Sequence, residues 1–262
     1  MITLYEHPLS PYAQKVKIAL REKGVPFEVA MPAGIGAGST EGAFAEAAPR
    51  REVPALIDGD VSLFDSTIIL EYIEDKWPEP SLFPADPAAR AKCRIIEDVM
   101  DTHFEAISWG LGELHHFKRG DEATRAKIEQ NAARQIAGFM AWLSGQLGEA
   151  DWFSGNEFGW ADLSVAPYLN GIAGFGYAPE AGTPLGAWLA RVNERDSVRE
   201  AAEQARASIT GMQAVSAAVE AGLFRRHYRD HRLEWMIRSG GMEIVRDGIE
   251  HNTIRFTDHW DN

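Results

Sequence analysis

Ser10 and Pro11 stand where a helix is expected to begin, and their residue types suit the binding of an anion. Serine is a preferred N-cap, and proline is favoured at the first helical position because an N–H there would have no helical partner. The third helical position holds Ala13 rather than Glu, so no capping box fills this terminus. The hydroxyl and the free amides could hold a thiolate, whereas the alternative is a simple N-cap.

Asp65 and Ser66 form a second polar pair at an expected helix start, again without Glu or Gln at the third position. Ser66 and the helix amides could hold a carboxylate while Asp65 holds an ammonium group, which is the recognition that an α-amino acid moiety requires. The alternative is that both side chains only cap an ordinary helix.

Val53 and Pro54 open a β-prone run. If the bond between them is cis, the turn presents the backbone amide and carbonyl of Val53 outward, ready to pair with a peptide-like ligand. The alternative is a proline on an edge strand, where its missing N–H costs nothing.

The elements that must position these residues fit a small mixed sheet with helices. Strands are expected over 2–6, 27–31, 53–57 and 61–64, and helices over 13–23 and 66–76. The polar face of the first helix carries Gln14, Lys15, Lys17 and Arg21. The turn Asp58-Gly59-Asp60 predicts a type I′ hairpin. The order βαβ then ββα differs from the repeating βαβα of a dinucleotide fold.

A cluster of prolines at 78, 80, 84 and 87 marks a change in the character of the sequence. We therefore divide the chain into an α/β domain over 1–80, a linker over 81–87 and an all-helical domain over 88–224, with a C-terminal extension over 225–262. Helices are expected over 89–109, 122–147, 161–172 and 185–195. The extension carries seven arginines and seven acids, so the rest of the chain holds the whole net charge of −13. We expect the extension to pack against that acidic body.

Together, the three motifs resemble the amino-terminal domain of the glutathione transferase superfamily. They are Ser-Pro-Tyr at the first helix, Val-Pro-Ala-Leu before the hairpin and Asp-Ser before the next helix, and the resemblance covers residues 1 to about 224. It implies a thioredoxin-like domain followed by an all-α domain. It also implies that Asp162 is a folding determinant in a buried capping segment, in which Gly159 replaces the usual Ser or Thr. We expect that glycine to weaken the helix start.

The resemblance also implies roles for the site residues. Ser10 would donate a hydrogen bond to the glutathione sulfur and lower the pKa of the thiol. Val53, with Pro54, would pair with the cysteinyl backbone, and Asp65 and Ser66 would hold the γ-glutamyl end. Glu52 departs from the Lys or Gln of relatives, so Arg51 or its neighbour at position 50 would have to bind the glycyl carboxylate.

An acceptor pocket is expected between the two domains. Leu9 and Tyr12 would line one side, and the other would be lined by residues at helical spacing, although core packing explains these about as well: Met100, His103, Phe104 and Ile107. The predicted reaction is transfer of glutathione to a hydrophobic, aromatic electrophile, as in detoxification. Two alternatives stay open, a glutathione-dependent β-etherase or lyase acting on aromatic ethers and a non-catalytic binding or regulatory protein of the same fold.

Several other features of the sequence say less about function. Cys93 is the single cysteine, so thiol exchange at the Ser10 position and paired-cysteine redox chemistry are not expected. His227 and His231 have the i, i+4 spacing of metal ligands but no third ligand, so we expect no metal. The loop Gly34-Ile-Gly-Ala-Gly38 is not a dinucleotide fingerprint. The acidic charge argues against nucleic acid, and the sequence shows no leader and no membrane span, so we expect a cytoplasmic protein, by resemblance a homodimer.

Overall fold

The computed structural model describes residues 1–32 and 42–257 of the chain. The first part is an α/β domain with the elements β1 (Ile2–Tyr5), α1 (Pro11–Glu22), β2 (Phe27–Ala30), α2 (Ala43–Ala47), β3 (Ala55–Asp58), β4 (Val61–Phe64) and α3 (Ser66–Lys76). The sheet order is β2-β1-β3-β4, with β1 and β2 parallel and β3 and β4 each antiparallel to its neighbour. The predicted mixed sheet and the thioredoxin-like arrangement are confirmed.

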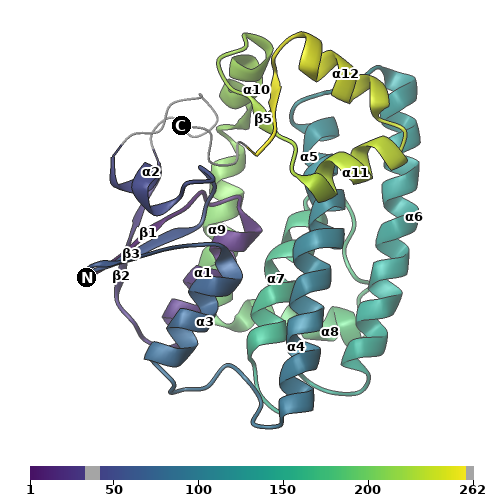
Figure 1. Ribbon diagram of the computed structural model, residues 1–262. Coiled ribbons are helices and arrows are strands. Elements are labelled where there is room, and N and C mark those ends of the chain that lie inside the picture. Colours follow the sequence, from purple (N-terminus) through teal and green to yellow (C-terminus); the bar gives the residue numbers. More distant parts are fainter. Residues whose placement is uncertain (33–41, 258–262) are drawn as a thin grey trace.

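The two faces of the sheet bury different residues. Leu4 and Leu56 point to the face covered by α1 and α3 and belong to the main core, whereas Ala55 packs against Phe44 of α2 on the opposite face. This alternation follows the period of two in a strand. The helix α2 was not predicted, and the glycine loop over 34–38 lies outside the described residues. Figure 1 shows α1 and α3 between the sheet and the helical domain.

The hairpin turn differs from the expected type. Gly59 has a φ of +62°, but Asp60 is not among the residues with positive φ. A type I′ turn needs positive φ at both central residues, whereas a type II′ turn needs it only at the first, where glycine is preferred. Gly59 rather than the Asp-Gly pair therefore determines the turn.

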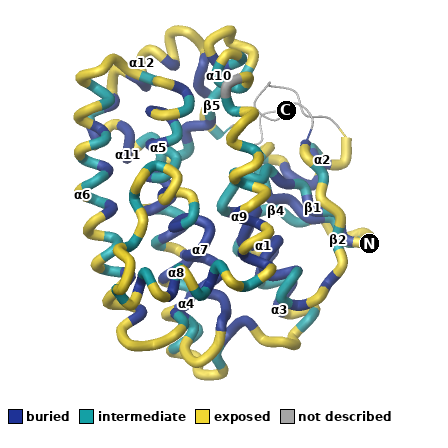
Figure 2. The backbone as a smooth tube through the Cα atoms, turned by 180° about the vertical axis from the view of Figure 1, so that it is seen from behind, coloured by how far each residue is buried: buried dark blue, intermediate teal, exposed yellow. Residues whose placement is uncertain are grey.

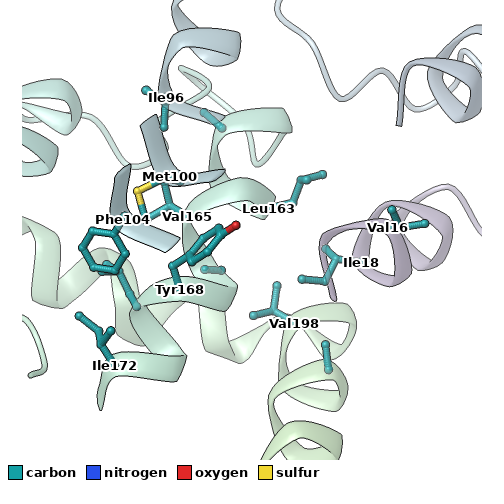
Figure 3. Packing of buried hydrophobic residues seen from close by; sticks show 14 of the residues in the cluster. Val16, Ile18, Ile96, Met100, Phe104, Leu163, Val165, Tyr168, Ile172 and Val198 are labelled. Atoms are coloured by element: carbon teal, nitrogen blue, oxygen red, sulfur yellow. The ribbon is translucent and has the colours of Figure 1, made fainter. Parts of the chain in front are cut away.

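The helical part consists of α4 (Pro87–Val99), a π-helical turn (Met100–Phe104), α5 (Glu105–His115), α6 (Glu122–Leu147), α7 (Trp160–Ala173), α8 (Pro184–Glu194), α9 (Asp196–Ile209) and α10 (Met212–Glu220). The helix expected over 89–109 is thus one interrupted helical segment over 87–115, and the sequence reading missed α9 and α10. Trp160 and Trp188 are wholly buried in this domain. Figure 3 shows α7 residues such as Leu163 and Tyr168 between α4 and the helices α1 and α9.

Burial of the polar face of α1 is the main surprise of the packing. Lys15 and Lys17 have no exposed surface, because α7 and α9 pack against this helix. The helix starts at the N-cap Ser10, and its C-terminal end is followed by Gly24, whose φ of +62° is the left-handed conformation that glycine adopts most easily.

The C-terminal extension folds back over the helical domain. It contains β5 (Arg226–His227), α11 (Asp230–Arg238), α12 (Met242–Glu250) and β6 (Ile254–Arg255), with β5 and β6 parallel. The helix α11 packs on α5, and Figure 1 shows the extension above α5 and α6. Figure 2 shows exposed residues along the outer sides of α6 and α12 and mostly buried residues in α7. None of the described helices is long and apolar enough to cross a bilayer.

Candidate active site between the two domains

One cavity of about 1290 Å³ brings the three sequence motifs together. Ser10, the Val53-Pro54 turn and the Asp65-Ser66 pair all contribute to its wall, as do Leu9, Tyr12 and Arg51. The opposite wall comes from α4, α5, α7, α9, α10 and the extension. The cavity therefore lies between the α/β domain and the helical domain.

Ser10 is held in place by its own turn. Its backbone N–H donates to the carbonyl of His7 at 2.8 Å, and its Oγ accepts from the Ala13 N–H at 3.3 Å. The Oγ is used as an acceptor, and no described residue accepts its proton, so the hydroxyl can donate into the cavity. This is the geometry that a thiolate-stabilising serine needs.

His7 supports this turn and was missed by the sequence reading. Its Nδ1 accepts the backbone N–H of Leu9 at 3.2 Å, and the side chain lines the cavity. Burial lowers the pKa of His7, which favours the neutral imidazole that this acceptor role requires. His7 directly follows the strand expected over 2–6, and nothing in the sequence shows that its ring turns back on Leu9.

The peptide bond between Val53 and Pro54 is cis. Arg51, two residues before Val53, has a φ of +53°, so the chain bends sharply just before this turn. The condition under which we expected Val53 to present its backbone groups outward is therefore met, and both residues line the cavity.

Asp65 combines an N-cap with a left-handed backbone. Its φ is +75°, and its Oδ1 accepts from the Thr67 N–H at 3.0 Å at the start of α3. Its Oδ2 lies 3.8 Å from a guanidinium nitrogen of Arg50, too far for a hydrogen bond. One carboxylate oxygen caps the helix while the other remains for a ligand, and the buried Ser66 follows it in the cavity wall.

Tyr12 lines the cavity, but its hydroxyl has an internal partner. The OH donates to the backbone carbonyl of Asp101 at 2.7 Å, and Arg229 lies over the ring at 5.8 Å. Burial and the nearby Glu105 raise the pKa of Tyr12 well above its usual value. Tyr12 therefore stays protonated and joins the two domains.

The expected acceptor wall on α4 and α5 needs correction. Met100, Phe104 and Ile107 are wholly buried in the hydrophobic core, and His103 is exposed outside the cavity. Figure 3 shows Met100 and Phe104 beside Val165 and Tyr168 of α7. The same helical segment turns a more polar face to the cavity, namely Asp101, Thr102, Glu105, Ser108, Trp109 and Gly112. The apolar stripe marked the core, as amphipathic helices of globular proteins do.

A buried ionic network joins the domains beneath the cavity. Lys15 of α1 donates to Glu97 at 2.5 Å and to Asp101, and Glu97 also accepts from Trp160 Nε1 at 2.5 Å and from Thr67 at 2.9 Å. Burial raises the pKa of Asp101 to about 6 against the opposing effect of Lys15. Because Lys15 and Glu97 have almost no exposed surface, loss of either partner would leave a buried charge.

Two acids of α5 anchor the extension. Glu105 accepts hydrogen bonds from Arg232, and it lies 2.9 Å from His231 Nε2. Glu113 pairs with Arg226 at 2.5 Å and accepts from the Tyr228 hydroxyl at 3.1 Å. The expectation that the extension packs against the acidic body is confirmed, and His231 contacts Glu105 there. No group of three potential metal ligands occurs among the described residues.

The counter-charge of Glu52 comes from the C-terminal extension, a contact that the sequence analysis did not predict. Its Oε1 is 3.1 Å from His227 Nδ1 and 3.7 Å from Arg229, both in the extension. Burial and four nearby arginines lower the pKa of His227 to about 2, so this imidazole is neutral and Arg229 carries the positive charge. We expected Arg50 or Arg51 to bind the glycyl carboxylate near Glu52 and did not predict a contact between Glu52 and the extension.

The start of α7 is stronger than expected. A Cβ on Gly159 would collide with the carbonyl oxygen of Leu82, so no Ser or Thr fits there. Ser154 takes over the cap, because its Oγ accepts from the Ala161 N–H at 3.1 Å. Asp162 has no exposed surface and accepts from the backbone N–H groups of Phe153 and Gly159.

Comparison with known proteins matches both parts of the chain. The family pattern "Glutathione S-transferase, N-terminal domain" matches residues 4–81, and "Glutathione S-transferase, C-terminal domain" matches residues 121–191. A structure of a glutathione S-transferase from Methylobacterium radiotolerans, in complex with glutathione sulfonate, is 28% identical with a TM-score of 0.65. That comparison covers 77% of this chain and 94% of the other.

Two curated relatives differ in what their names describe. Glutathione S-transferase U28 of Arabidopsis thaliana is 31% identical, covering 72% of this chain and 83% of that protein. A stringent starvation protein A homolog of Haemophilus ducreyi is 28% identical, covering 75% of this chain and 87% of that protein. With both domain patterns present and this identity over most of a named transferase, the chain belongs to the glutathione S-transferase family.

Proposed function

We propose that this protein is a glutathione transferase that holds glutathione as the thiolate at Ser10 and transfers its sulfur to a hydrophobic, aromatic electrophile. The observation that carries the proposal is the convergence of Ser10, the Val53-Pro54 turn and the Asp65-Ser66 pair on one cavity. Each motif alone has an ordinary structural explanation. Their convergence supports a single ligand with a thiol, a peptide backbone and an α-amino acid end.

The chemistry at Ser10 is stabilisation of an anion. A hydroxyl that donates a hydrogen bond favours the thiolate over the thiol, and the N-terminus of α1 adds its partial positive charge. The thiolate is the nucleophile that attacks an electrophilic carbon. The neutral His7 beside Ser10 adds no negative charge to oppose this ionisation.

Binding of the rest of glutathione follows from the same wall. The backbone of Val53 pairs with the cysteinyl peptide group, and Asp65 and Ser66 hold the γ-glutamyl ammonium and carboxylate. The acceptor then occupies the part of the cavity on the helical domain, where Trp109, Phe117 and Phe175 supply aromatic surface. We further propose that the enzyme acts in the cytoplasm as a homodimer, which light scattering would show as twice 29.0 kDa.

The test is the rate of conjugation of glutathione with 1-chloro-2,4-dinitrobenzene by the wild type and by Ser10→Ala. The substitution removes both a cap and the proposed donor, so it needs a matched control. Thr183→Ala removes the N-cap of α8, which accepts from the Gly186 N–H at 3.1 Å and does not line the cavity. We expect both variants to lose about 1 kcal/mol of stability. Only Ser10→Ala should lose turnover, by about a hundredfold, and equal rates in all three proteins would contradict the proposal.

A second candidate is a non-catalytic protein that binds glutathione through the same site. The likeness to a stringent starvation protein A homolog favours it, because that name designates no transferase. It predicts glutathione binding that depends on Asp65 and Ser66, with no turnover of any aromatic electrophile. Turnover lost in Ser10→Ala would exclude it.

A further inference from the structure

The part of the cavity wall that runs from the middle of α5 to the start of the extension differs in charge from the rest of the site. We define this acceptor wall as the cavity-lining residues between positions 108 and 226. It contains three arginines, Arg206, Arg225 and Arg226, and no Asp or Glu among the described residues. All seven acids that line the cavity lie between 52 and 105 or at 230. In a chain of net charge −13, this is a local reversal of sign.

Arg225 is the half-buried arginine of this wall for which the described part of the chain supplies no partner. It is half-buried and lines the cavity, yet no hydrogen bond, ion pair or ring contact engages it among the described residues. Its neighbour Arg226 is engaged, since it pairs with Glu113 at 2.5 Å and lies 4.0 Å from the centre of the Phe117 ring. A half-buried guanidinium without a partner gains free energy from an anion that reaches it.

Flat side chains line the same wall as this charge. Trp109, Phe117 and Phe224 belong to this wall, and the rings of His116 and Phe175 are tilted against each other with their centres 5.4 Å apart. Aromatic surfaces of this kind favour a planar ligand. The wall thus combines a surface for an aromatic ring with a fork of donors that matches a carboxylate or sulfonate.

We infer that the acceptor is an aromatic anion, a carboxylate or sulfonate on a planar ring, and that Arg225 determines this specificity. The inference rests on the proposed function and adds the class of acceptor to it. Glutathione itself does not account for the wall, because the resemblance assigns its γ-glutamyl carboxylate to Ser66 and its glycyl carboxylate to Arg50 or Arg51, which lie in the α/β domain. An anionic acceptor also fits Arg206, which is exposed and belongs to the same wall.

The first test is binding, which needs no turnover. Calorimetry would compare 2-naphthoate with the neutral 2-naphthamide, in the presence of S-methylglutathione. We expect the wild type to bind the carboxylate about tenfold more tightly than the amide. Arg225→Gln should lose that preference while its affinity for the amide and for S-methylglutathione stays unchanged. Equal affinity for the two ligands in the wild type, or a full preference kept by the double variant Arg206→Gln/Arg225→Gln, would overturn the inference.

Arg246→Gln is the matched control. Arg246 lies on α12 of the same extension, is 64% exposed, pairs with Glu243 and does not line the cavity. Its substitution changes the net charge by the same amount and should leave the preference for the carboxylate intact. A loss of preference in both variants would assign the effect to overall charge and contradict a role for Arg225.

The second test is conjugation of 4-chloro-3,5-dinitrobenzoate against its amide. The glutathione sulfur forms a bond to the ring carbon that carries chlorine, chloride leaves with the bonding pair, and the thiol proton passes to solvent. Arg225→Gln should lower kcat/KM for the benzoate about tenfold relative to the amide. If no electrophile is turned over but the naphthoate preference depends on Arg225, the proposed function fails and the anion site stands. If both acceptors are conjugated with no dependence on Arg225, the function stands and this inference fails.

Discussion

Arg229 of the C-terminal extension lies 3.7 Å from Glu52, the residue that precedes the cis peptide bond of the α/β domain. The residues are far apart in the sequence, and the contact brings a positive charge to a place where the resemblance to transferases leads one to expect a local Lys or Gln. The extension therefore contributes to the same cavity wall as the Val53-Pro54 turn.

This contact predicts coupling between Arg229 and Glu52 in glutathione binding. Arg229→Gln leaves the Glu52 carboxylate without its guanidinium partner beside the binding segment, so the Kd for the negatively charged glutathione should rise about fivefold. In Glu52→Gln/Arg229→Gln the unpaired carboxylate is gone, and the Kd should return toward that of the wild type. Calorimetric titration of the wild type and the three variants measures the coupling, expected at about 1 kcal/mol. Effects that simply add would contradict it.

The Glu105 anchor predicts how stability depends on pH. Burial opposes ionisation of Glu105, but the charge of Arg232 and the hydrogen bonds from His231 and Arg232 outweigh it and lower its pKa from 4.5 to about 2. The folded state therefore binds fewer protons than the unfolded state between these values, so this stabilisation is complete above pH 4.5 and is lost as the pH falls toward 2. The lowered pKa of Glu105 thus contributes about 3 kcal/mol to the free energy of unfolding at neutral pH.

Urea unfolding of the wild type and of Glu105→Gln at pH 7 and pH 3 measures the pH dependence of the free energy of unfolding. The wild type should be more stable than the variant at pH 7, and the gap should narrow at pH 3. Glu129→Gln is the control, since Glu129 is 43% exposed and pairs with His115 at the surface. A gap that stays constant between the two pH values would refute the anchoring role of Glu105.

At Gly159 we expect a serine to destabilise the helix start, whereas serine at an N-cap usually stabilises a helix. Introducing Ser at an N-cap normally stabilises a helix, but here its Cβ would collide with the Leu82 carbonyl, so Gly159→Ser should lower the Tm. Gly145 is the contrasting position, because it lies within α6 with nothing near its added Cβ. Gly145→Ala should stabilise the protein by about 0.5–1 kcal/mol. A higher Tm for Gly159→Ser would show that the segment around Leu82 moves aside.

Local signals in the sequence were sufficient for most of the fold. The helices over Ser66–Lys76 and Glu122–Leu147 have the predicted limits, because caps at Asp65 and Asp121 and clear periodicity define them. The turn at Gly59 and the helix start at Trp160 departed from expectation. The turn depends on the backbone angles of Gly59, and the helix start depends on the distant carbonyl of Leu82. Local composition reveals neither.

The candidate site could be predicted only in part, because some of its residues have no local signal in the sequence. The residues at helix starts, Ser10 and Asp65, have local signatures and were found. The residues of the segment over 87–115 that line the cavity were not predicted. The apolar stripe that includes Phe104 belongs to the hydrophobic core, whereas the residues of this segment that line the cavity are mostly polar. Contacts between the extension and Glu52 depend on tertiary folding and have no local signal.

The central claim is that Ser10 ionises the thiol of bound glutathione. Calorimetric titration with glutathione at pH 7, in two buffers of different ionisation enthalpy, measures the protons released on binding. We predict proton release in the wild type, little release in Ser10→Ala despite retained binding, and none for S-methylglutathione in either protein. Equal release by the wild type and Ser10→Ala, or no binding by the wild type at millimolar glutathione, would contradict the account.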